Sequence, residues 1–375
     1  MKILMVISNF YPKVGGTEKQ CFELSCALSA AGHQVTVFTR NTGGLAFEEE
    51  ISGFKIKRAK VFGPLFFDSI LFMIAVFREI VFGPKADIIH VHMISSFALA
   101  VLAAAKIRKI KTVFSVSGGK DLNEFTMSKK NFFGRIKLFI IKKSKMKILA
   151  KNSQVFQWLK SENLGKWEII LFKNGVDTLK YNVPLLDEKQ KAKEKIGAFG
   201  FNFLFVGRLS WEKRIKEFLE VFAELISEEP SKKFNFIIVG DGPCKKDLEQ
   251  AVVSLGIQKR VFILGQKYEL RDFYFAGEVF VLPSISEGLS NSMLEAMSCG
   301  LALAASKNGG ASEIIKNGEN GCLFDPLNRK EIKNCLKQLL SCPDIKDMGK
   351  INRKIASEQF SMTVVAKELS LIYGD

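Results

Sequence analysis

The fold class is decided by the stretch Val279-Phe-Val-Leu-Pro-Ser-Ile-Ser-Glu287-Gly-Leu-Ser-Asn-Ser-Met-Leu-Glu295-Ala-Met-Ser-Cys-Gly300. Its first four residues form a short apolar run with β-branched side chains, which predicts a buried strand. A polar turn follows, and a helix is expected to begin near Ser290 or Asn291 and to end at Gly300. A strand, a turn at its carboxyl end and a helix form the repeating unit of a parallel α/β fold.

The same alternation continues outward from this stretch in both directions. Strands are expected at residues 3–7, 34–39, 88–91, 112–116 and 169–171, and again at 201–206, 234–239, 261–264 and 279–282. A polar, lysine-rich stretch at 187–195 separates the two series. We predict two doubly wound parallel-sheet (Rossmann-like) domains facing a cleft: residues 1–180, residues 181–351, and a last helix at 352–375 that returns to the N-terminal domain. A ligand should bind at the carboxyl ends of the strands.

Composition and charge narrow the class of protein. The 375 residues are 47% hydrophobic and 25% charged, as in a globular chain with more than one domain. Residues 1–180 hold 28 lysines and arginines against 13 acids, whereas residues 181–375 hold 27 against 26. The N-terminal half should therefore face an anionic partner, either nucleic acid or an acidic membrane surface.

Two further features bear on location. The seven cysteines include no C-x-x-C pair, which favours reduced thiols in the cytoplasm over disulfides or a zinc site. The most membrane-like stretch, 65–82, is interrupted by Asp68, Arg78 and Glu79. Because a spanning helix rarely holds such charges, any membrane contact is expected to be peripheral.

Two carboxylates of the quoted stretch are candidates for a binding site. Glu287 lies in the turn, and Glu295 lies one turn inside the helix, so both can face the same cleft. The first backbone amides of a helix point at an anion bound there. An ordinary capped helix with one loop carboxylate and one exposed carboxylate would give the same pattern.

A second group of charged residues follows the strand at 201–206. Arg208 comes directly after this strand, and Lys213 lies five residues later on the loop that leads to a helix. Arginine binds phosphate oxygens in a bidentate fork and lysine supplies a mobile point charge, so the pair suits a diphosphate. The alternative is solvated charge at a strand end. The glycines of Gly240-Asp-Gly-Pro243 are explained at least as well by a tight turn.

In the N-terminal half, Gly15 and Gly16 lie between the first strand and the first helix, where helix amides can meet a phosphate. The stretch lacks the G-x-G-x-x-G pattern and a downstream acid, so an NAD site is not indicated. The histidines are His33, His90 and His92, which do not suggest a metal site. His90 and His92 end a strand, and we expect one to face the core and the other the cleft.

Short motifs accumulate in a fixed order along nearly the whole chain. They are Pro12-Lys-Val-Gly-Gly-Thr-Glu18, Ala31-Gly-His-Gln-Val-Thr-Val37, Asp87-Ile-Ile-His-Val-His92, Asn174-Gly-Val-Asp177, Gly207-Arg-Leu-Ser-Trp-Glu-Lys213, Gly240-Asp-Gly-Pro243, the element from Glu287 to Glu295, Gly309-Gly-Ala-Ser-Glu313 and Asn320-Gly321. With this ordered set the chain resembles a family 4 glycosyltransferase of the GT-B fold (glycosyl transferases group 1). The Glu-x7-Glu element and the Arg208/Lys213 pair are its most specific members.

The resemblance implies transfer of a sugar from a UDP- or GDP-linked donor with retention of anomeric configuration, without an obligatory metal or other cofactor. By this resemblance Arg208 and Lys213 hold the diphosphate as charge builds on the leaving group, and Glu287 contacts the transferred sugar. The implied donor contacts are Glu295 on the ribose, the amides of Asn291, Ser292 and Met293 on phosphate, Gly265 and Gln266 near the base, and Gly16. The acceptor or sugar side is assigned to Gly15, Gly16, His92, Ser117 and Asp121.

Two positions depart from the family pattern. The family commonly has His-Gly after the fourth strand, whereas this chain reads Val116-Ser-Gly-Gly-Lys-Asp121. Either Ser117, Lys120 or Asp121 positions the sugar instead, or His92 takes the role, or catalysis is impaired; we favour the first. Arg214 stands where the family often has glycine, and it is expected to add positive charge beside the donor phosphates.

The positive charge is concentrated in residues 106–151, which hold 14 lysines and arginines and two acids. One helical stripe in this segment combines Phe132, Phe133, Ile136, Phe139 and Ile140, flanked by Arg135, Lys137 and Lys142. Such a helix is typical of a surface that lies in an anionic lipid interface. A core helix with a solvated basic face is equally compatible with the spacing, and Leu138 and Ile141 lie off the stripe.

Taken together, we predict a hexosyl- or N-acetylhexosaminyl-type glycosyltransferase in surface polysaccharide biosynthesis. It would act at the cytoplasmic membrane face on a lipid-linked or growing glycan acceptor, and residues 106–151 would contact the anionic membrane. A soluble acceptor, or a non-catalytic sugar-nucleotide-binding subunit, are alternatives. A nucleic-acid partner is disfavoured, because no helix-turn-helix, zinc-finger or RNP-type motif accompanies the charge.

Overall fold

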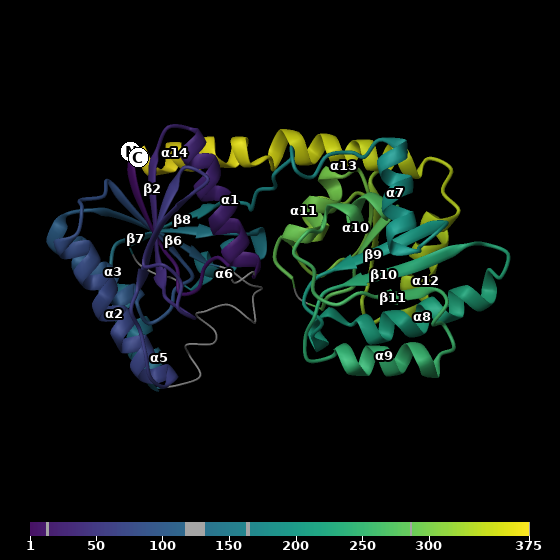
Figure 1. The fold of residues 1–375 in the computed structure, drawn as a ribbon, viewed down its shortest axis with the longest axis horizontal. Helices are drawn as coiled ribbons and strands as arrows, with labels where there is room; N and C mark the ends of the chain where they lie inside the picture. Colours follow the sequence, from purple (N-terminus) through teal and green to yellow (C-terminus); the bar gives the residue numbers. More distant parts are fainter. Residues whose placement is uncertain (13–14, 117–131, 163–165, 286, 375) are drawn as a thin grey trace. The chain divides into compact units, whose positions relative to one another are not determined.

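A computed structural model describes residues 1–12, 15–116, 132–162, 166–285 and 287–374. The chain forms two compact units, Met1–Gly175 with Met362–Asp375, and Val176–Ser361 (Figure 1). The sequence-based limits, 180 and 351, differ slightly from these, because helix α13 (Ile345–Gln359) packs on α11 (Asn291–Ser298) within the second unit. The C-terminal segment that returns to the first unit is helix α14 (Met362–Gly374), which follows α13.

The first unit is built on an eight-stranded sheet of order β3-β4-β2-β1-β5-β6-β7-β8. Its strands are β1 (Lys2–Val6), β2 (Gln34–Arg40), β3 (Glu48–Ile51), β4 (Phe54–Ala59), β5 (Ile88–His92), β6 (Lys111–Val116), β7 (Met146–Ala150) and β8 (Trp167–Leu171). All neighbours are parallel except β3 and β4, which form an antiparallel pair at the edge. The expectation of a wholly parallel sheet is therefore corrected at this edge.

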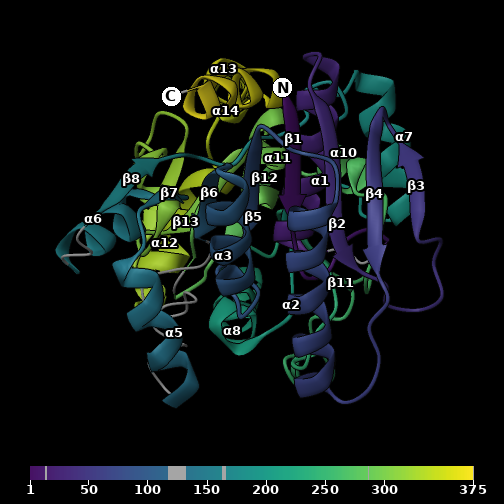
Figure 2. The ribbon, with the colours of Figure 1, turned by 90° about the vertical axis from the view of Figure 1, so that its left-hand side faces the viewer.

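Helices cover both faces of this sheet. Helices α1 (Gly16–Ala30) and α14 share one apolar core with the strands, and the other core contains residues of α2 (Leu65–Phe82), α3 (Ala98–Arg108), α5 (Phe132–Lys143) and α6 (Ser153–Ser161). Figure 2 shows α2, α3 and α5 in front of the strands. No helix of the described segments has the length and apolar content required to cross a membrane.

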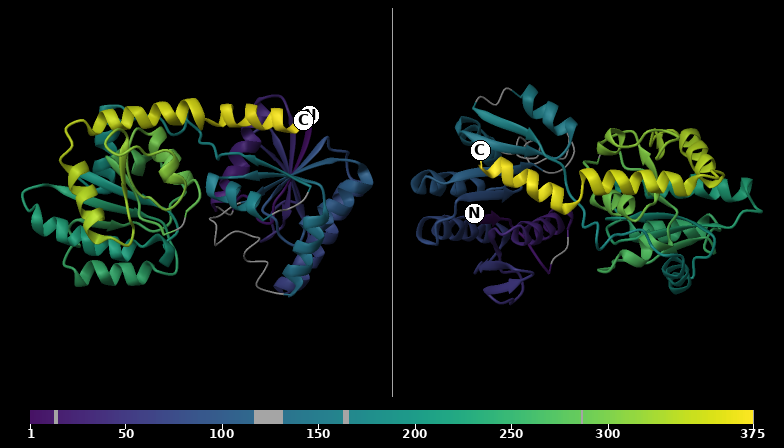
Figure 3. Two further views of the ribbon diagram at one scale, coloured as in Figure 1. Left: turned by 180° about the vertical axis from the view of Figure 1, so that it is seen from behind. Right: turned by 90° about the horizontal axis from the view of Figure 1, so that it is seen from above.

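The second unit has a six-stranded parallel sheet of order β11-β10-β9-β12-β13-β14. Its strands are β9 (Phe201–Val206), β10 (Phe234–Val239), β11 (Val261–Ile263), β12 (Val279–Leu282), β13 (Ala302–Ser306) and β14 (Gly321–Phe324), and its helices are α7 (Leu186–Ile196), α8 (Ile215–Glu228), α9 (Lys245–Ser254), α10 (Arg271–Ala276), α11, α12 (Arg329–Leu340) and α13 (Figure 3). The strand order reverses between β9 and β12. Ligands of doubly wound sheets bind at such a switch point, beyond the carboxyl ends of the strands.

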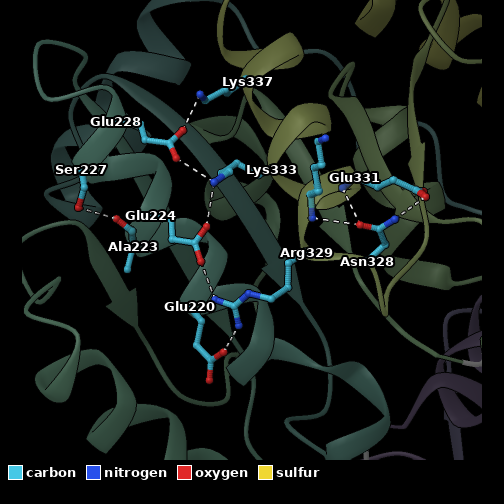
Figure 4. Close-up of polar contacts among 11 residues, drawn as sticks. Glu220, Ala223, Glu224, Ser227, Glu228, Asn328, Arg329, Glu331, Lys333 and Lys337 are labelled. Carbon is cyan, nitrogen blue, oxygen red and sulfur yellow. Dashed lines mark hydrogen bonds and ion pairs between the residues drawn. The ribbon is translucent and has the colours of Figure 1, made fainter.

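Helices α8 and α12 are joined by a ladder of ion pairs on the surface of the second unit (Figure 4). The ladder sets Glu220, Glu224 and Glu228 of α8 against Arg329, Lys333 and Lys337 of α12. Lys333 Nζ lies 2.9 Å from Glu224 Oε2 and 2.8 Å from Glu228 Oε1. The members of each set are four residues apart, which places them on one face of their helix.

We expect Lys333→Ala to lower the midpoint of thermal unfolding slightly at neutral pH and low salt. Hydrogen bonds from Arg329 and Lys333 hold the pKa of Glu224 below its usual value, and those from Lys333 and Lys337 do the same for Glu228. Such carboxylates stabilise the fold above their unfolded-state pKa, and this contribution is lost as the pH falls through the folded-state value. Calorimetry should therefore show a smaller difference from wild type in acid or at high salt. An equal difference under all conditions would mean that Lys333 acts through packing.

Candidate functional site

The switch point of the second sheet brings together two loops that are far apart in sequence. The loop after β9 carries Arg208 and the short helix η1 (Trp211–Lys213), and the loop after β12 carries Glu287. Lys213 Nζ forms an ion pair with Glu287 Oε2. The Ile285 amide donates to the Glu212 carbonyl oxygen at 2.9 Å, so backbone contacts also connect the loops. The predicted cation and the predicted carboxylate therefore meet at one edge of one sheet.

Lys213 has an unusual electrostatic environment. Its side chain is only 15% exposed, and burial lowers its pKa from 10.5 to about 8, an effect that Glu212 partly opposes. The ammonium is still the main form at neutral pH, where the Glu287 carboxylate compensates its charge. An incoming diphosphate would meet a cation that is already held in place and largely desolvated. Electrostatic attraction is strong in such a low-dielectric environment.

We expect the affinity for UDP or GDP to fall as the pH rises through about 8 in the wild type, and to stay nearly constant in Lys213→Arg. Only the ammonium attracts the diphosphate, and its fraction decreases about tenfold per pH unit above the pKa, whereas a guanidinium remains charged. Titration calorimetry across this range measures both profiles. A flat profile for the wild type would show that Lys213 does not contact the nucleotide.

Arg208 differs from Lys213 in that its side chain is exposed at the end of β9. Within the described ranges, it has no ion-pair partner and no side-chain hydrogen bond. Its loop is supported by the turn after β10, where a Cβ at Gly240 would lie 1.8 Å from the Gly207 carbonyl oxygen. A Cβ at Gly242 would lie 2.3 Å from the Leu209 carbonyl oxygen. These glycines thus allow the two backbones on either side of Arg208 to approach closely.

Arg214 corrects an expectation from the sequence. Its φ of 53° is in the left-handed region, which favours glycine and which forms the turn into α8. Its side chain does not add a free charge beside Lys213, because Nε donates to the Pro326 carbonyl oxygen at 3.0 Å and the guanidinium pairs with Glu217 at 3.2 Å. Arginine therefore replaces the family's glycine at the cost of strain and holds the turn through its own contacts.

The Glu287 loop is held from the other side by the turn that precedes η2 (Gly310–Glu313). Glu287 and Gly309 form a β-bridge, and the Gly310 amide donates to the Glu287 carbonyl oxygen at 3.3 Å. Gly309 has a φ of 134°, and a Cβ there would lie 2.3 Å from the same oxygen. Sequence reasoning assigned no role to Gly309 beyond its place in a motif, because its contact with Glu287 exists only in the folded chain.

Helix α11 begins directly after this loop. Its N-cap is Ser290, whose hydroxyl lies 2.9 Å from that of Ser292, and its first turn contains Asn291 and Met293. The first amides of a helix have no partner in the preceding turn, and the positive end of the helix dipole favours an anion nearby. Asn291 and Ser292 are partly exposed and Met293 is buried, so backbone groups rather than the Met293 side chain can face a ligand.

Glu295 lies one turn into α11 but is only 3% exposed. Its Oε2 accepts a hydrogen bond from the hydroxyl of Tyr274 on α10 at 2.7 Å. Burial, together with the neighbouring Glu295, raises the pKa of Tyr274 well above its ordinary value, which keeps the phenol a donor. Nothing in the sequence around Tyr274 signalled this contact, and the ribose role of Glu295 stays a prediction.

The candidate base-binding loop follows β11. Gly265 has a φ of 68°, and its carbonyl oxygen accepts from the Gly240 amide at 2.9 Å, which ties this loop to the turn after β10. Gln266 is exposed. Both therefore lie at the carboxyl edge of the sheet that also carries Arg208.

In the first unit, Gly15 is the N-cap of α1 and Gly16 is its first residue. The Glu18 carboxylate folds back over this end, since a Cβ at Gly15 would lie 2.3 Å from Glu18 Oε2. The amino end of α1 is thus covered by an internal anion in this structure. Ser117 and Asp121 lie outside the described residues.

The expectation that His90 and His92 face opposite sides is wrong. Side chains two residues apart in a strand lie on the same face. The rings are stacked with centroids 4.2 Å apart, and both are buried. His90 contacts Tyr373 and Ser115 at 2.6 and 2.8 Å, and His92 Nε2 lies 3.3 Å from Met5 Sδ. Burial lowers the pKa of His92 to about 3, so it forms part of the neutral core beneath α1 and α14.

Comparison with known proteins identifies the family of the chain. The model of the family described as "Glycosyl transferases group 1" matches residues 187–356, and that of "Glycosyltransferase Family 4" matches residues 14–178. The chain belongs to the family 4 glycosyltransferases. The two matches fall in both units, and the switch-point loops lie within the match to residues 187–356.

Individual relatives cover most or all of the chain. The alpha-monoglucosyldiacylglycerol synthase of Acholeplasma laidlawii is 25% identical, over 100% of this chain and 97% of its own. An Escherichia coli galactosyltransferase, described as acting on alpha-D-GlcNAc-diphosphoundecaprenol, is 28% identical over 78% of this chain and 76% of its own. The crystal structure of Anabaena HepE with UDP and glucose matches with a TM-score of 0.80, 17% identity and full coverage of both chains. This likeness shows that the glycosyltransferase has the GT-B fold.

Proposed function

We propose that this glycosyltransferase moves a hexose or N-acetylhexosamine from a UDP- or GDP-linked donor to a lipid-linked or growing glycan acceptor, with retention of configuration. It would act in surface polysaccharide biosynthesis at the cytoplasmic face of a membrane, as a peripheral protein, without an obligatory metal. The observation that carries the proposal is the ion pair of Lys213 with Glu287 at the switch point, on the same loop as Arg208, whose side chain has no partner among the described residues.

The chemistry asks mainly for stabilisation of a leaving group. In the transfer, the bond between the sugar's anomeric carbon and the diphosphate oxygen breaks, a bond to the acceptor oxygen forms on the same face, and the acceptor proton leaves with the nucleoside diphosphate. Arg208 and Lys213 would neutralise the charge that develops on the diphosphate. The amides of α11 would add to this field, and Glu287 would position the sugar and Lys213 together.

Two observations support a lipid-linked acceptor. The relatives include an alpha-monoglucosyldiacylglycerol synthase and an enzyme described as acting on a diphosphoundecaprenol-linked sugar. Helix α5 buries Leu138 and Ile141, which explains the two residues off the apolar stripe, and exposes Phe139 and Ile140 beside Lys143. The remaining residues of the stripe, Phe132, Phe133 and Ile136, have side chains outside the described set.

Titration calorimetry with UDP, GDP and NAD tests the donor site. We expect one nucleoside diphosphate to bind saturably, no binding of NAD, and loss of binding in Arg208→Ala. Lys259→Ala is the matched control. It removes one exposed charge just before β11, at the amino ends of the strands, whereas the site lies at their carboxyl ends. Absence of nucleotide binding, or equal losses in both variants, would refute the assignment.

A further inference from the structure

Helix α2 in the first unit is apolar on two faces. Its inner face buries Phe72, Val76 and Ile80, each at most 2% exposed, against the sheet and α3. Its outer face exposes Phe67, Ile70, Ile74 and Phe82, by 61%, 39%, 51% and 78%. The exposed positions recur at helical spacing, so they form one stripe along the 18-residue helix. A contiguous exposed apolar stripe marks an interaction surface.

The outer stripe is accompanied by positive charge. Arg78 lies within it, and a hollow of about 720 Å³ at the end of the helix is lined by Lys60, Ala75, Arg78, Glu79, Phe82 and Gly83. Lys60 and Arg78 are exposed and have no ion pair or side-chain hydrogen bond within the described parts of the chain. The hollow thus combines two uncompensated cations with an exposed aromatic ring.

The two acids of α2 do not cancel this charge. Asp68 is paired with Arg40 of β2 at 2.6 Å, and Glu79 is paired with Lys57 of β4 at 3.0 Å. Both acids are thereby neutralised by bases from the sheet. The outer side of the helix is left with apolar side chains and cations, a combination that complements the headgroup boundary of an anionic bilayer.

Neighbouring helices extend the same chemistry. Helix α3 packs on both α2 and α5, and the three helices form one layer over the sheet (Figure 2). Ile107 at the end of α3 is 61% exposed, between the exposed Lys106 and the half-buried Arg108. Strands β6 and β7, which also belong to the basic segment 106–151, are largely buried within the sheet. Among the described residues of that segment, 106–116 and 132–151, those at the surface lie largely at the ends of elements and in α5.

We propose that the outer face of α2 binds an anionic phospholipid bilayer. Phe67, Ile70, Ile74 and Phe82 enter the boundary between headgroups and acyl chains, while Arg78 and Lys60 hold a lipid phosphate in the hollow. Long basic side chains can bury their stems in lipid and keep their charges at the headgroups. The inference rests on the proposed function, since a lipid-linked acceptor lies in such a bilayer, and it assigns the main apolar contact to α2 rather than to residues 106–151.

Flotation of the full-length protein with vesicles of phosphatidylglycerol and phosphatidylcholine tests this surface. We expect the double variant Ile70→Ser/Ile74→Ser, and separately Arg78→Glu, to bind anionic vesicles about tenfold more weakly than wild type. Leu371→Ser is the control, because Leu371 is 66% exposed on α14, which packs on the opposite face of the sheet. Unchanged vesicle binding of the α2 variants would overturn the proposal.

A fluorescence measurement distinguishes membrane contact from the binding of another molecule to the outer face of α2. In Ile74→Trp, brominated phosphatidylglycerol should quench the added tryptophan, after subtraction of the wild-type signal, whereas Leu371→Trp should show no added quenching. Absence of quenching at position 74 overturns the proposal. So does a change in the sedimentation of the protein without lipid in Ile70→Ser/Ile74→Ser, because it would indicate that a second copy of the chain covers this face. UDP or GDP binding should be unchanged in every variant. A failed donor site would instead abolish nucleotide binding in the wild type.

Discussion

Arg208→Ala and Lys213→Ala are each expected to slow sugar transfer by about two to three orders of magnitude, because each removes one charge that stabilises the departing diphosphate. The two should differ in their secondary effects. Arg208 is exposed and unpaired among the described residues, so its loss should leave the fold intact. Lys213→Ala also leaves the Glu287 carboxylate without its ion-pair partner, close to the donor phosphates.

Steady-state rates with the preferred donor measure these effects. Because both cations act on one diphosphate, the double variant should lose less than the product of the single losses. Lys259→Ala, at the amino ends of the strands of the same sheet, should retain the wild-type rate. Near-normal rates in either site variant would remove that residue from the catalytic machinery.

Gly309→Ala is expected to reduce transfer by about a hundredfold, although Gly309 carries no functional group. Its Cβ would lie 2.3 Å from the Glu287 carbonyl oxygen, so the loop that positions Glu287 must shift. A displacement of about 1 Å in a catalytic group can cost about this factor. The positive φ of 134° adds backbone strain of about 1 to 3 kcal/mol.

Gly318→Ala separates the two effects in this comparison. Gly318 also has a positive φ, of 81°, but a Cβ there meets nothing within 4 Å. Both variants should lower the midpoint of thermal unfolding, while only Gly309→Ala should slow transfer. Equal activities in the two variants would mean that the contact between Gly309 and Glu287 does not position the site.

Much of the architecture was predictable because its determinants are local. Apolar β-branched and aromatic runs such as residues 201–206 and 234–239 signalled central parallel strands, and the turn residues after them marked the edge that carries the site. Five strands of the structure, β3, β4, β7, β13 and β14, were not predicted. In β4 apolar residues are interrupted by lysines and an arginine, and β14 is only four residues long. β3 contains three consecutive glutamates at a sheet edge, β13 is rich in alanine, and β7 lies among lysines.

The site itself was predictable only in part. Motif order located Arg208, Lys213, Glu287 and Glu295, but it could not show which side chains are paired or enclosed. The contacts of Lys213 with Glu287 and of Tyr274 with Glu295 join residues 74 and 21 positions apart, which only the tertiary structure brings together. The histidine error had a different origin, since the period of two in a strand already required His90 and His92 to share a face.

Turnover with a defined donor tests the central claim most directly. Purified protein is incubated with a membrane lipid extract and with the labelled nucleotide sugar whose nucleoside diphosphate binds. The amounts of released nucleoside diphosphate and of labelled lipid product are measured, and the anomeric configuration of the product is determined. We expect equal amounts of both products, the donor's anomeric configuration in the glycolipid, and loss of both in Arg208→Ala. Inverted configuration, or nucleotide release that persists in Arg208→Ala, would contradict this account.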